Sequence, residues 1–405
     1  MSKVIVIGAG PAGIMAAITA AEKHDVILLD GNEKIAKKLF ITGKGRCNIT
    51  NAKDIGDFFD YIPGNPHFLY SALYSYTNQD VINMIEGEGT KLKVERGGRM
   101  FPESDKSSDI IRALSKKLSK AKVNIQLNSK VTDVFLKDNK ITGIEINNTR
   151  KISADNYIIA TGGASYPLTG SRGEGQMLAK KLGHKIIDLK PSLVPVELKD
   201  EWVKELMGLT LRNVKLDILN SKNKCCYSNQ GEMKFTSYGI SGPIVLSGSR
   251  SIDDKDKYSI SIDLKPSLDF KELDLRLQKD FKKYINKDFR NSLGDLLPQQ
   301  MIPLIIRLSK IDEYKKVNEI TKEERKNLVN LIKGLRADVK GLRPLAEAIV
   351  TAGGVSTLEI DPSTMKSKII DNLSFAGEVI DVDAFTGGYN VQIALSTGYL
   401  AGKYL

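Results

Sequence analysis

The sequence predicts an α/β fold in which both ends of the chain build one parallel-sheet domain and the middle forms an inserted domain. Residues 3–30 have the pattern strand, glycine turn, helix and strand, which is how a parallel sheet opens. A similar glycine-and-strand texture returns after about residue 341. Between these regions the chain first alternates apolar and polar residues and then shows lysine-rich helical periodicity. One domain interrupted by an insertion is the simplest arrangement that explains this order.

The N-terminal elements follow from residue type and spacing. The run "KVIVIG", residues 3–8, is rich in β-branched residues, as a strand buried on both faces should be. The segment "PAGIMAAITAAEK" predicts a helix whose alanines let it lie close to the sheet. "DVILLD", which ends at Asp30, predicts the second strand and completes a β-α-β unit.

Three further segments predict strands before the insertion. A short strand is expected at 123–127. Residues 130–147 alternate apolar and polar residues around "KDNK", which predicts a hairpin. "YIIATGG", residues 157–163, predicts a buried strand that runs into glycines.

These patterns set the expected domain boundaries. The discontinuous domain should comprise residues 1–192 and 343–405, and the inserted domain residues 193–342. Within the insertion, alternating segments such as "VKLDILN" and "YSISIDL" predict a β-barrel-like part at about 193–266. The helical part should follow at about 267–342.

The composition predicts a cytoplasmic protein that does not enter the membrane. Hydrophobic residues make up 41% and charged residues 27% of the 405 residues, as in ordinary globular enzymes. Three cysteines cannot form a disulfide framework, which suits a reducing compartment. No apolar run reaches the roughly 18 residues that span a bilayer. The glycines of the first apolar run fit a strand and turn rather than a signal peptide.

The chain is basic, with a formal net charge of +11. Residues 271–340 hold 17 Lys and Arg against 11 Asp and Glu. A solvated helical face explains this excess, and a surface for RNA or another anionic partner is the alternative. No aromatic-basic motif accompanies the charge, so we expect no nucleic-acid partner. The sequence leaves the oligomeric state open.

The motif "GAGPAG" predicts a Rossmann-like dinucleotide site. Gly8 would make the tight turn, Gly10 would let the backbone approach a pyrophosphate, and Gly13 would let the helix pack on the strand. The phosphates would then lie at a helix N-terminus. Asp30, at the end of the second strand, can accept both ribose hydroxyls and would repel a 2′-phosphate. The site should therefore hold FAD or NAD rather than NADP.

Two later glycine stretches favour FAD. "IIATGGASYPLTG" and "FAGEVIDVDAFTGGYNVQIALSTG" resemble the second and third fingerprints of flavoproteins with two dinucleotide-binding domains. In that superfamily the late motif begins a helix whose N-terminus points at the flavin, where it stabilises negative charge. The residues that carry these motifs are Thr161, Gly162, Gly163, Gly377, Glu378, Gly387, Gly388 and Asn390.

A closer resemblance covers residues 4–405. "KKLFITGKGRCNITN", "PSLVPVEL", "GEMKFTSYGISGPIVLSGS", "EAIVTAGGVS" and "AGEVIDVDAFTGGYNVQ" are similar, in order, to blocks of the bacterial HI0933-like flavoprotein family. Members of this family include bile-acid dehydro-reductases and aminoacetone oxidases. The resemblance implies an FAD domain built from both chain ends, with an inserted domain at about 193–342.

The resemblance also implies a set of FAD contacts. Asp30 stands where the family often has Glu, and Lys44 and Ala384 stand where it often has Gly. The methyl group of Ala384 would lie beside the flavin. The residues whose positions match family FAD contacts are Ala12, Asp30, Lys37, Lys38, Gly43, Arg46, Cys47, Val131, Glu378, Asn390 and Val391.

The cysteines predict no redox or metal centre. Disulfide reductases use two nearby thiols, but the residue five after Cys47 is Ala52. We therefore expect Cys47 to pack the cofactor loop rather than to carry electrons. Cys225 and Cys226 lie in an alternating segment without a CxxC partner, so we expect them to be buried in a strand.

The catalytic acid or base is not fixed by the sequence. Tyr166 in "GGASYP" and Tyr238 in "FTSYGISGP" are candidate proton donors, and His67 is a weaker candidate for the substrate pocket. Each of the tyrosines fits an ordinary core position equally well.

Three functions fit this pattern. The first is NAD(P)H-dependent reduction of a C=C or C=X bond conjugated to a carbonyl in a small molecule, such as a dehydro-bile acid. No second G-x-G-x-x-G follows a strand, so NAD(P)H would visit the flavin directly. The second is oxidation of a small amine such as aminoacetone with release of hydrogen peroxide. The third is an RNA-associated flavoprotein that uses its basic insertion to bind RNA.

Overall fold

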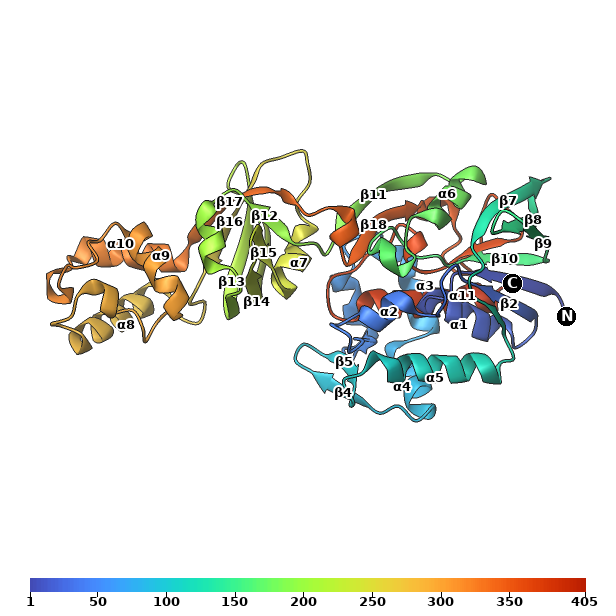
Figure 1. The fold of residues 1–405 in the computed structure, drawn as a ribbon, viewed down its shortest axis with the longest axis horizontal. Coiled ribbons are helices and arrows are strands. Elements are labelled where there is room, and N and C mark those ends of the chain that lie inside the picture. Colours follow the sequence, from blue (N-terminus) through green and yellow to red (C-terminus); the bar gives the residue numbers. More distant parts are fainter. The chain divides into compact units, whose positions relative to one another are not determined.

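The computed structural model describes residues 1–405, which divide into two compact units. The first unit comprises Met1–Ser192 and Pro344–Leu405, and the second comprises Leu193–Arg343. Figure 1 shows that the first unit is built from both the blue and the red end of the chain. The mixed α/β class predicted from the sequence is confirmed. None of the α-helices combines the length and the apolar composition that a helix needs to span a bilayer.

A five-stranded sheet lies at the centre of the first unit. Its strand order is β19-β10-β1-β2-β6, and every neighbouring pair is parallel. The order reverses direction between β1 and β10, and this switch point is where doubly wound sheets bind ligands at the carboxyl ends of the strands. The strands are β1 (Lys3–Ile7), β2 (Asp25–Leu29), β6 (Asn124–Gln126), β10 (Asn156–Ile159) and β19 (Leu373–Phe375).

Two helices from opposite chain ends pack together beside this sheet. They are α1 (Pro11–Ala20) and α11 (Tyr389–Lys403). A Cβ at Gly398 would lie 2.2 Å from the Ala12 carbonyl oxygen, so the two backbones meet directly. Small residues on both helices thus place the N-terminal and C-terminal parts of the first unit in one core.

Smaller sheets and helices complete the first unit. The three-stranded sheet of the predicted hairpin contains β7 (Val131–Lys137), β8 (Lys140–Ile146) and β9 (Arg150–Ile152). The other strands are β3 (Thr50–Asn51), β4 (Leu92–Glu95) and β5 (Arg99–Pro102) in one sheet, and β11 (Ile186–Ser192) with β18 (Val350–Val355) in another. The remaining α-helices are α2 (Lys37–Ile41), α3 (Tyr70–Ser75), α4 (Asn78–Gly87), α5 (Ser107–Lys120) and α6 (Glu174–Lys181).

The second unit joins a closed barrel to a group of helices. The barrel order is β12-β15-β14-β13-β16-β17. Its strands are β12 (Val196–Leu198), β13 (Thr210–Asn220), β14 (Cys225–Phe235), β15 (Gly239–Ser241), β16 (Tyr258–Asp263) and β17 (Leu335–Leu342). The helices are α7 (Pro243–Ser249), α8 (Phe270–Lys283), α9 (Ile302–Ser309) and α10 (Lys322–Lys333). One hydrophobic cluster runs through the barrel and these helices.

Two sequence predictions for the insertion were wrong in detail. Residues 335–342 form β17, which pairs with β16 and β12, because their alternating burial suits a barrel strand rather than a helix. Cys225 and Cys226 do lie on a strand, β14, but both are exposed. They lie at the end of the β13–β14 hairpin, where the register shifts and the strand leaves the core.

Candidate cofactor site

Two of the three glycines in the turn after β1 are required by contacts within the protein. Gly8 has φ of 105°, and a Cβ there would lie 2.5 Å from the Ala160 carbonyl oxygen on the neighbouring chain segment after β10. A Cβ at Gly13 would lie 1.8 Å from the Gly8 carbonyl oxygen. These two glycines are required by the close contact of β1, β10 and α1.

Gly10 has a different environment. A Cβ at Gly10 would meet no protein atom within 4 Å, so nothing in the chain itself demands glycine there. Gly10 is the N-cap of α1, makes no side-chain cap and is followed by Pro11, so the first turn of the helix keeps free N–H groups. Open space in front of an uncapped helix N-terminus fits a pyrophosphate.

Asp30 is held in a fixed orientation at the end of β2. Its Oδ2 accepts the Ala9 backbone N–H at 2.7 Å, and its Oδ1 accepts both the backbone and side-chain N–H groups of Asn32 at 2.8 and 2.9 Å. A carboxylate has further lone pairs, so these bonds orient it without exhausting it. Val131, another position that matches a family FAD contact, begins β7 and is almost fully buried.

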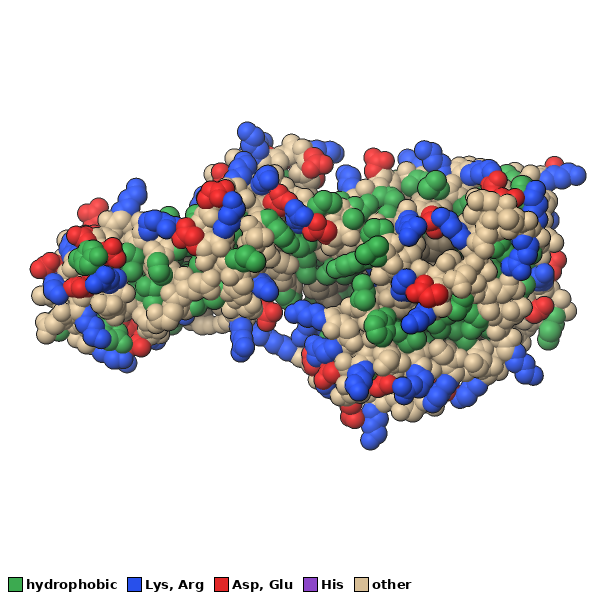
Figure 2. Space-filling model, viewed as in Figure 1, with side chains coloured by type: hydrophobic (Ala, Val, Ile, Leu, Met, Phe, Trp, Pro, Cys, Tyr) green, Lys and Arg blue, Asp and Glu red, His purple; other side chains and the backbone are tan.

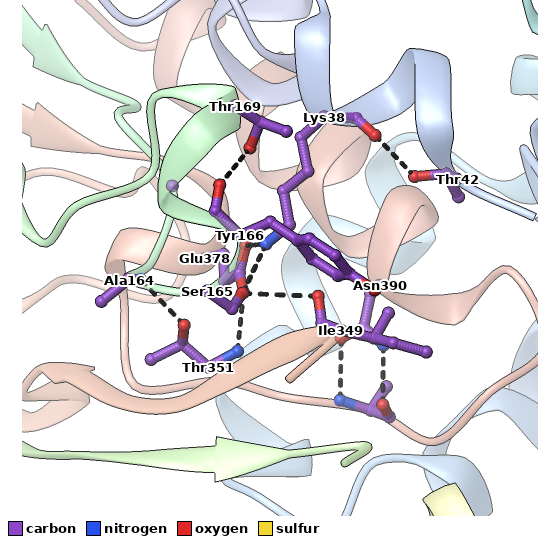
Figure 3. A network of polar contacts seen from close by, with 12 residues as sticks. Lys38, Thr42, Ala164, Ser165, Tyr166, Thr169, Ile349, Thr351, Glu378 and Asn390 are labelled. Carbon is purple, nitrogen blue, oxygen red and sulfur yellow. Dashed lines mark hydrogen bonds and ion pairs between the residues drawn. The ribbon is translucent and has the colours of Figure 1, made fainter. Parts of the chain in front are cut away.

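A polar network joins α2, the segment after β10 and the segment after β19 (Figure 3). Lys38 Nζ donates to Ser165 Oγ at 2.7 Å and forms an ion pair with Glu378 Oε2 at 2.9 Å. Glu378 Oε1 accepts the Thr351 N–H at 2.7 Å. The Thr351 hydroxyl in turn accepts the Ala164 N–H at 2.8 Å. Two predicted cofactor residues, Lys38 and Glu378, therefore contact each other.

The glycines beside this network have steric reasons. A Cβ at Gly163 would lie 2.4 Å from Thr351 Oγ1, so a side chain there would displace the network. Gly162 has φ of 77°, and its carbonyl oxygen accepts the Gln176 side-chain N–H. The Thr161 hydroxyl is buried without a hydrogen-bond partner. Gly377 has φ of 77° and faces Ala12, where a Cβ would lie 2.7 Å from the Ala12 Cβ.

The N-terminus of α11 is positioned by its own loop. Gly388, the N-cap, has φ of 100°, and a Cβ there would lie 2.3 Å from the Thr50 carbonyl oxygen. Asn390 Oδ1 accepts the Ala384 N–H at 2.9 Å, and its Nδ2 donates to the Ala384 carbonyl at 2.6 Å (Figure 3). Val391 follows in the first turn and is partly exposed. Asn390 thus fixes the loop that precedes this helix.

The charged side chain of Arg46 in the loop at 41–50 is held by other parts of the protein. Arg46 pairs with Glu95 at 2.7 Å and Asp105 at 3.2 Å and lies over the Phe101 ring, so its guanidinium is committed to the protein. The hydrogen bond with Glu95 raises its pKa further. Gly43 has φ of 63° and a Cβ there would crowd the Phe101 ring.

Cys47 is enclosed by the protein. Its exposed fraction is 0%, burial raises the pKa of its thiol, and its N–H donates to the Thr42 carbonyl. A side chain with no exposed surface cannot touch a ligand in this conformation. Cys47 therefore offers no exposed surface to a ligand in this structure, and its predicted roles as a cofactor contact and as a packing residue stay predictions.

Of the three candidate proton donors, two lie in the first unit and one lies in the second. Tyr166 lies next to Ser165 in the first unit, with φ of 51° and 36% of its surface exposed. His67 is exposed and stacks on Tyr70 with ring centroids 5.8 Å apart. Tyr238 belongs to the second unit, where the Arg343 guanidinium lies 4.6 Å from its ring centroid.

Sequence reasoning missed several polar residues that shape the site. Ser165 and Thr351 complete the Lys38–Glu378 network. Both lie within the motifs described above, but as uncharged residues they did not stand out as site residues. Gln392, fully buried in α11, accepts the Thr50 hydroxyl at 2.6 Å and donates to the Tyr76 carbonyl at 3.0 Å. Only the three-dimensional packing reveals this role, because a glutamine inside a helix carries no sequence signal.

Comparison with known proteins assigns the chain to a family. The family model described as HI0933-like protein Rossmann domain matches residues 2–404. The chain belongs to the HI0933-like family. It is accordingly an FAD-dependent oxidoreductase, and its Gly10 space, uncapped α1 N-terminus and oriented Asp30 fit that cofactor.

Curated relatives of the chain carry two kinds of name. The chain is 30% identical to the 3-dehydro-bile acid delta(4,6)-reductase of Clostridium scindens, over 100% of this chain and 98% of that protein. It is 33% identical to the ribosomal RNA dihydrouridine synthase of Haemophilus influenzae, over 98% and 97%. It is 30% identical to the protein of the same name from Escherichia coli, over 99% and 97%.

Solved structures share the fold at low identity. The 3-ketosteroid delta1-dehydrogenase of Sterolibacterium denitrificans gives a TM-score of 0.52, with 12% identity and 99% coverage of both chains. A flavocytochrome c3 fumarate reductase gives a TM-score of 0.51 with 16% identity, over 100% of this chain and 78% of that one. At such identities the likeness concerns the fold alone.

Proposed function

We propose that this protein reduces a C=C bond conjugated to a carbonyl, with NAD(P)H as the source of electrons. The observation that carries the proposal is that full-length relatives with different substrates share one bond type. A delta(4) double bond next to a 3-oxo group and the C5=C6 bond of uridine are both conjugated to a carbonyl. One cofactor site can therefore serve both, and the substrate is selected elsewhere in the chain.

Uridine in ribosomal RNA is the substrate class that we favour. Two relatives from different organisms carry this activity in their names, and the chain has a net charge of +11, which attracts a polyanion. The sequence patterns alone ranked a small molecule first and a nucleic acid as unlikely. A small enone of the dehydro-bile-acid type stays the second candidate, because a relative of equal coverage carries that name.

The chain's own residues would hold FAD through three groups. The N-terminus of α1 would bind the pyrophosphate, Asp30 the ribose hydroxyls, and the N-terminus of α11 would face the flavin. Once reduced by NAD(P)H, bound FAD would supply the hydride for the carbon β to the carbonyl. The neighbouring carbon needs a proton, and Tyr166 is the candidate donor.

Tyr166 has an argument from backbone strain in addition to its position. Its φ of 51° and ψ of 62° are unfavourable for an aromatic residue, and such outliers persist where the surroundings impose them. Its backbone carbonyl accepts the Thr169 hydroxyl at 2.7 Å, which helps to hold the turn. The strained turn keeps a phenol partly exposed next to the Lys38–Glu378 network (Figure 3).

The cations around the cofactor loop are largely paired with carboxylates, so they would attract a nicotinamide dinucleotide only weakly. Lys37 pairs with Glu33, Lys38 with Glu378, and Arg46 with Glu95. Of the four cations near the cofactor loop, Lys44 alone makes no ion pair.

The test compares three substrates under anaerobic conditions. We expect NADH or NADPH to bleach the flavin, and ribosomal RNA transcribed in vitro to reoxidise it with a mass gain of two hydrogen atoms on uridine. Reoxidation by a 3-oxo-delta(4) steroid but not by RNA would make the small molecule the substrate. Bleaching by aminoacetone and by neither nicotinamide would refute the reductase and favour the amine oxidase.

A further inference from the structure

The helical part of the second unit contains an open polar cleft that the cofactor chemistry does not use. Its volume is about 500 Å³. It is formed around the segment that follows α8, the start of α9 and the segment near Lys316, which a β-bridge joins to Asp288. The lining residues are Asn286, Lys287, Asp288, Arg290, Asn291, Gly294, Gln299, Ile302 and Lys316.

The charge in this cleft is positive and incompletely neutralised. Asp288 is its only carboxylate and lies 2.7 Å from Lys316 Nζ but 4.0 Å from Arg290. Lys287 has no carboxylate partner, and its ammonium lies 4.8 Å from the Tyr284 ring centroid. Figure 2 shows Lys and Arg over the visible surface of the protein, mixed with acidic side chains in most places and gathered in the lower part of the right-hand unit. The cleft therefore holds three cations against one carboxylate.

Groups that could recognise bases stand beside these cations. Asn286, Asn291 and Gln299 are exposed, and their side chains make no hydrogen bonds within the protein. The Arg290 guanidinium lies 4.4 Å from the ring centroid of Tyr314, which is 58% exposed. Proteins bind single-stranded RNA with this combination of groups: cations contact the phosphates, amides contact the base edges, and an exposed aromatic ring stacks on a base.

We propose that this cleft is a docking site for a single-stranded segment of RNA, with Lys287 and Arg290 on the phosphates and Tyr314 as a stacking surface. The proposal rests on the proposed RNA substrate. It assigns to the helical part of the insertion the task of holding the RNA, separately from the reduction of uridine.

The test uses the full-length protein with FAD bound and a ribosomal RNA transcript made in vitro. In the double variant Lys287→Glu/Arg290→Glu we expect at least a tenfold loss of RNA affinity. Loss of two phosphate contacts should also make the slope of log K against log salt shallower by about 1.5. The matched control is Lys279→Glu/Lys326→Glu, which makes the same charge change on exposed lysines of α8 and α10 outside the cleft. The control should keep its slope and most of its affinity.

A third variant separates stacking from charge. Tyr314→Ala should lower RNA affinity by on the order of tenfold and leave the salt slope unchanged, because stacking on an aromatic ring releases no counterions. Flavin content, thermal stability and flavin bleaching by NAD(P)H without RNA should be the same in all variants. These readouts exclude misfolding and a damaged cofactor site as explanations.

The outcomes distinguish this inference from the proposed function. If the wild type reduces uridine in RNA and the cleft and control variants bind RNA equally well, the docking site is refuted and the function stands. If the wild type binds RNA through the cleft without reducing it, the docking site stands and the function fails. A wild type that binds no RNA overturns the docking site.

Discussion

At the scale of single residues, Gly10 separates what the fold needs from what the cofactor needs. Gly8 and Gly13 have protein atoms within 2.5 Å of the position where a Cβ would lie, but Gly10 has open space there. We expect Gly10→Val to fold with near-normal thermal stability and to lose FAD, because the side chain would fill the pyrophosphate space. Gly13→Val should fail to fold. Flavin absorbance and circular dichroism check both, and a flavin-loaded Gly10→Val protein would contradict this account.

Cys47 gives a second prediction at this scale. Burial raises the pKa of its thiol, so native protein should show two reactive thiols, Cys225 and Cys226, and a third only after unfolding. Cys47→Ser should keep FAD and turnover while losing about 1–2 kcal/mol of stability, since a hydroxyl is buried there. Thiol titration and chemical denaturation measure these effects. Loss of turnover with FAD still bound would restore a redox role.

The third residue prediction concerns the proton. Tyr166→Phe should lower the rate of substrate reduction by roughly 10²-fold or more, the usual effect of removing a general acid. Flavin reduction by NAD(P)H should be unchanged, because that step needs no proton from the phenol. The matched control is Tyr238→Phe in the second unit, which should be nearly neutral. Equal rates for Tyr166→Phe and the wild type would remove Tyr166 from the reaction.

At the scale of elements, the site depends on contacts between segments far apart in the sequence. The ion pair of Lys38 and Glu378 joins α2 to the segment after β19, and both side chains are about one-fifth exposed, at 23% and 21%. A partly buried pair contributes more to the free energy of unfolding than a surface pair does. Removing one partner is costly mainly because the other charge is then left without a counter-charge.

This yields a prediction with an internal control. Lys38→Met should weaken FAD binding and stability by about 1–2 kcal/mol, and Glu378→Gln by a similar amount. The double variant should lose less than the sum, because neither charge is then left alone. Calorimetric titration of apoprotein with FAD gives the coupling free energy. Strict additivity would mean that the pair does not act as a unit.

The same scale shows what the sequence could and could not reveal. Strand, glycine turn and helix were readable around Gly8–Gly13 because the positive φ of Gly8 and its close contact with Gly13 are both local to the motif. The contact partners could not be predicted from the sequence. Arg46, for example, forms ion pairs with Glu95 and Asp105, which lie about 50 residues or more away along the chain. The exposure of Cys225 and the strand at Leu335–Leu342 depend on barrel register, which alternation alone does not fix.

At the scale of the whole molecule, two separate hydrophobic clusters predict two cooperative units. The insertion begins and ends on the paired strands β12 and β17, where Val196 faces Leu342. A fragment of residues 193–343 therefore has its ends side by side and should fold alone. We expect a separate calorimetric transition for it, and in the full chain FAD should raise the other transition only. An unfolded fragment would contradict this division.

The pairing of α1 with α11 has a consequence for the order of events during synthesis. The ribosome makes α1 first, yet the surface that covers Ala12 and Ala16 comes from Gly398 and Gly402, which follow the whole insertion. The second unit can form its barrel while the first still lacks β19 and α11. Nascent chains stalled before residue 373 should therefore hold a folded insertion beside an incomplete nucleotide domain, a period in which α1 needs shielding from aggregation.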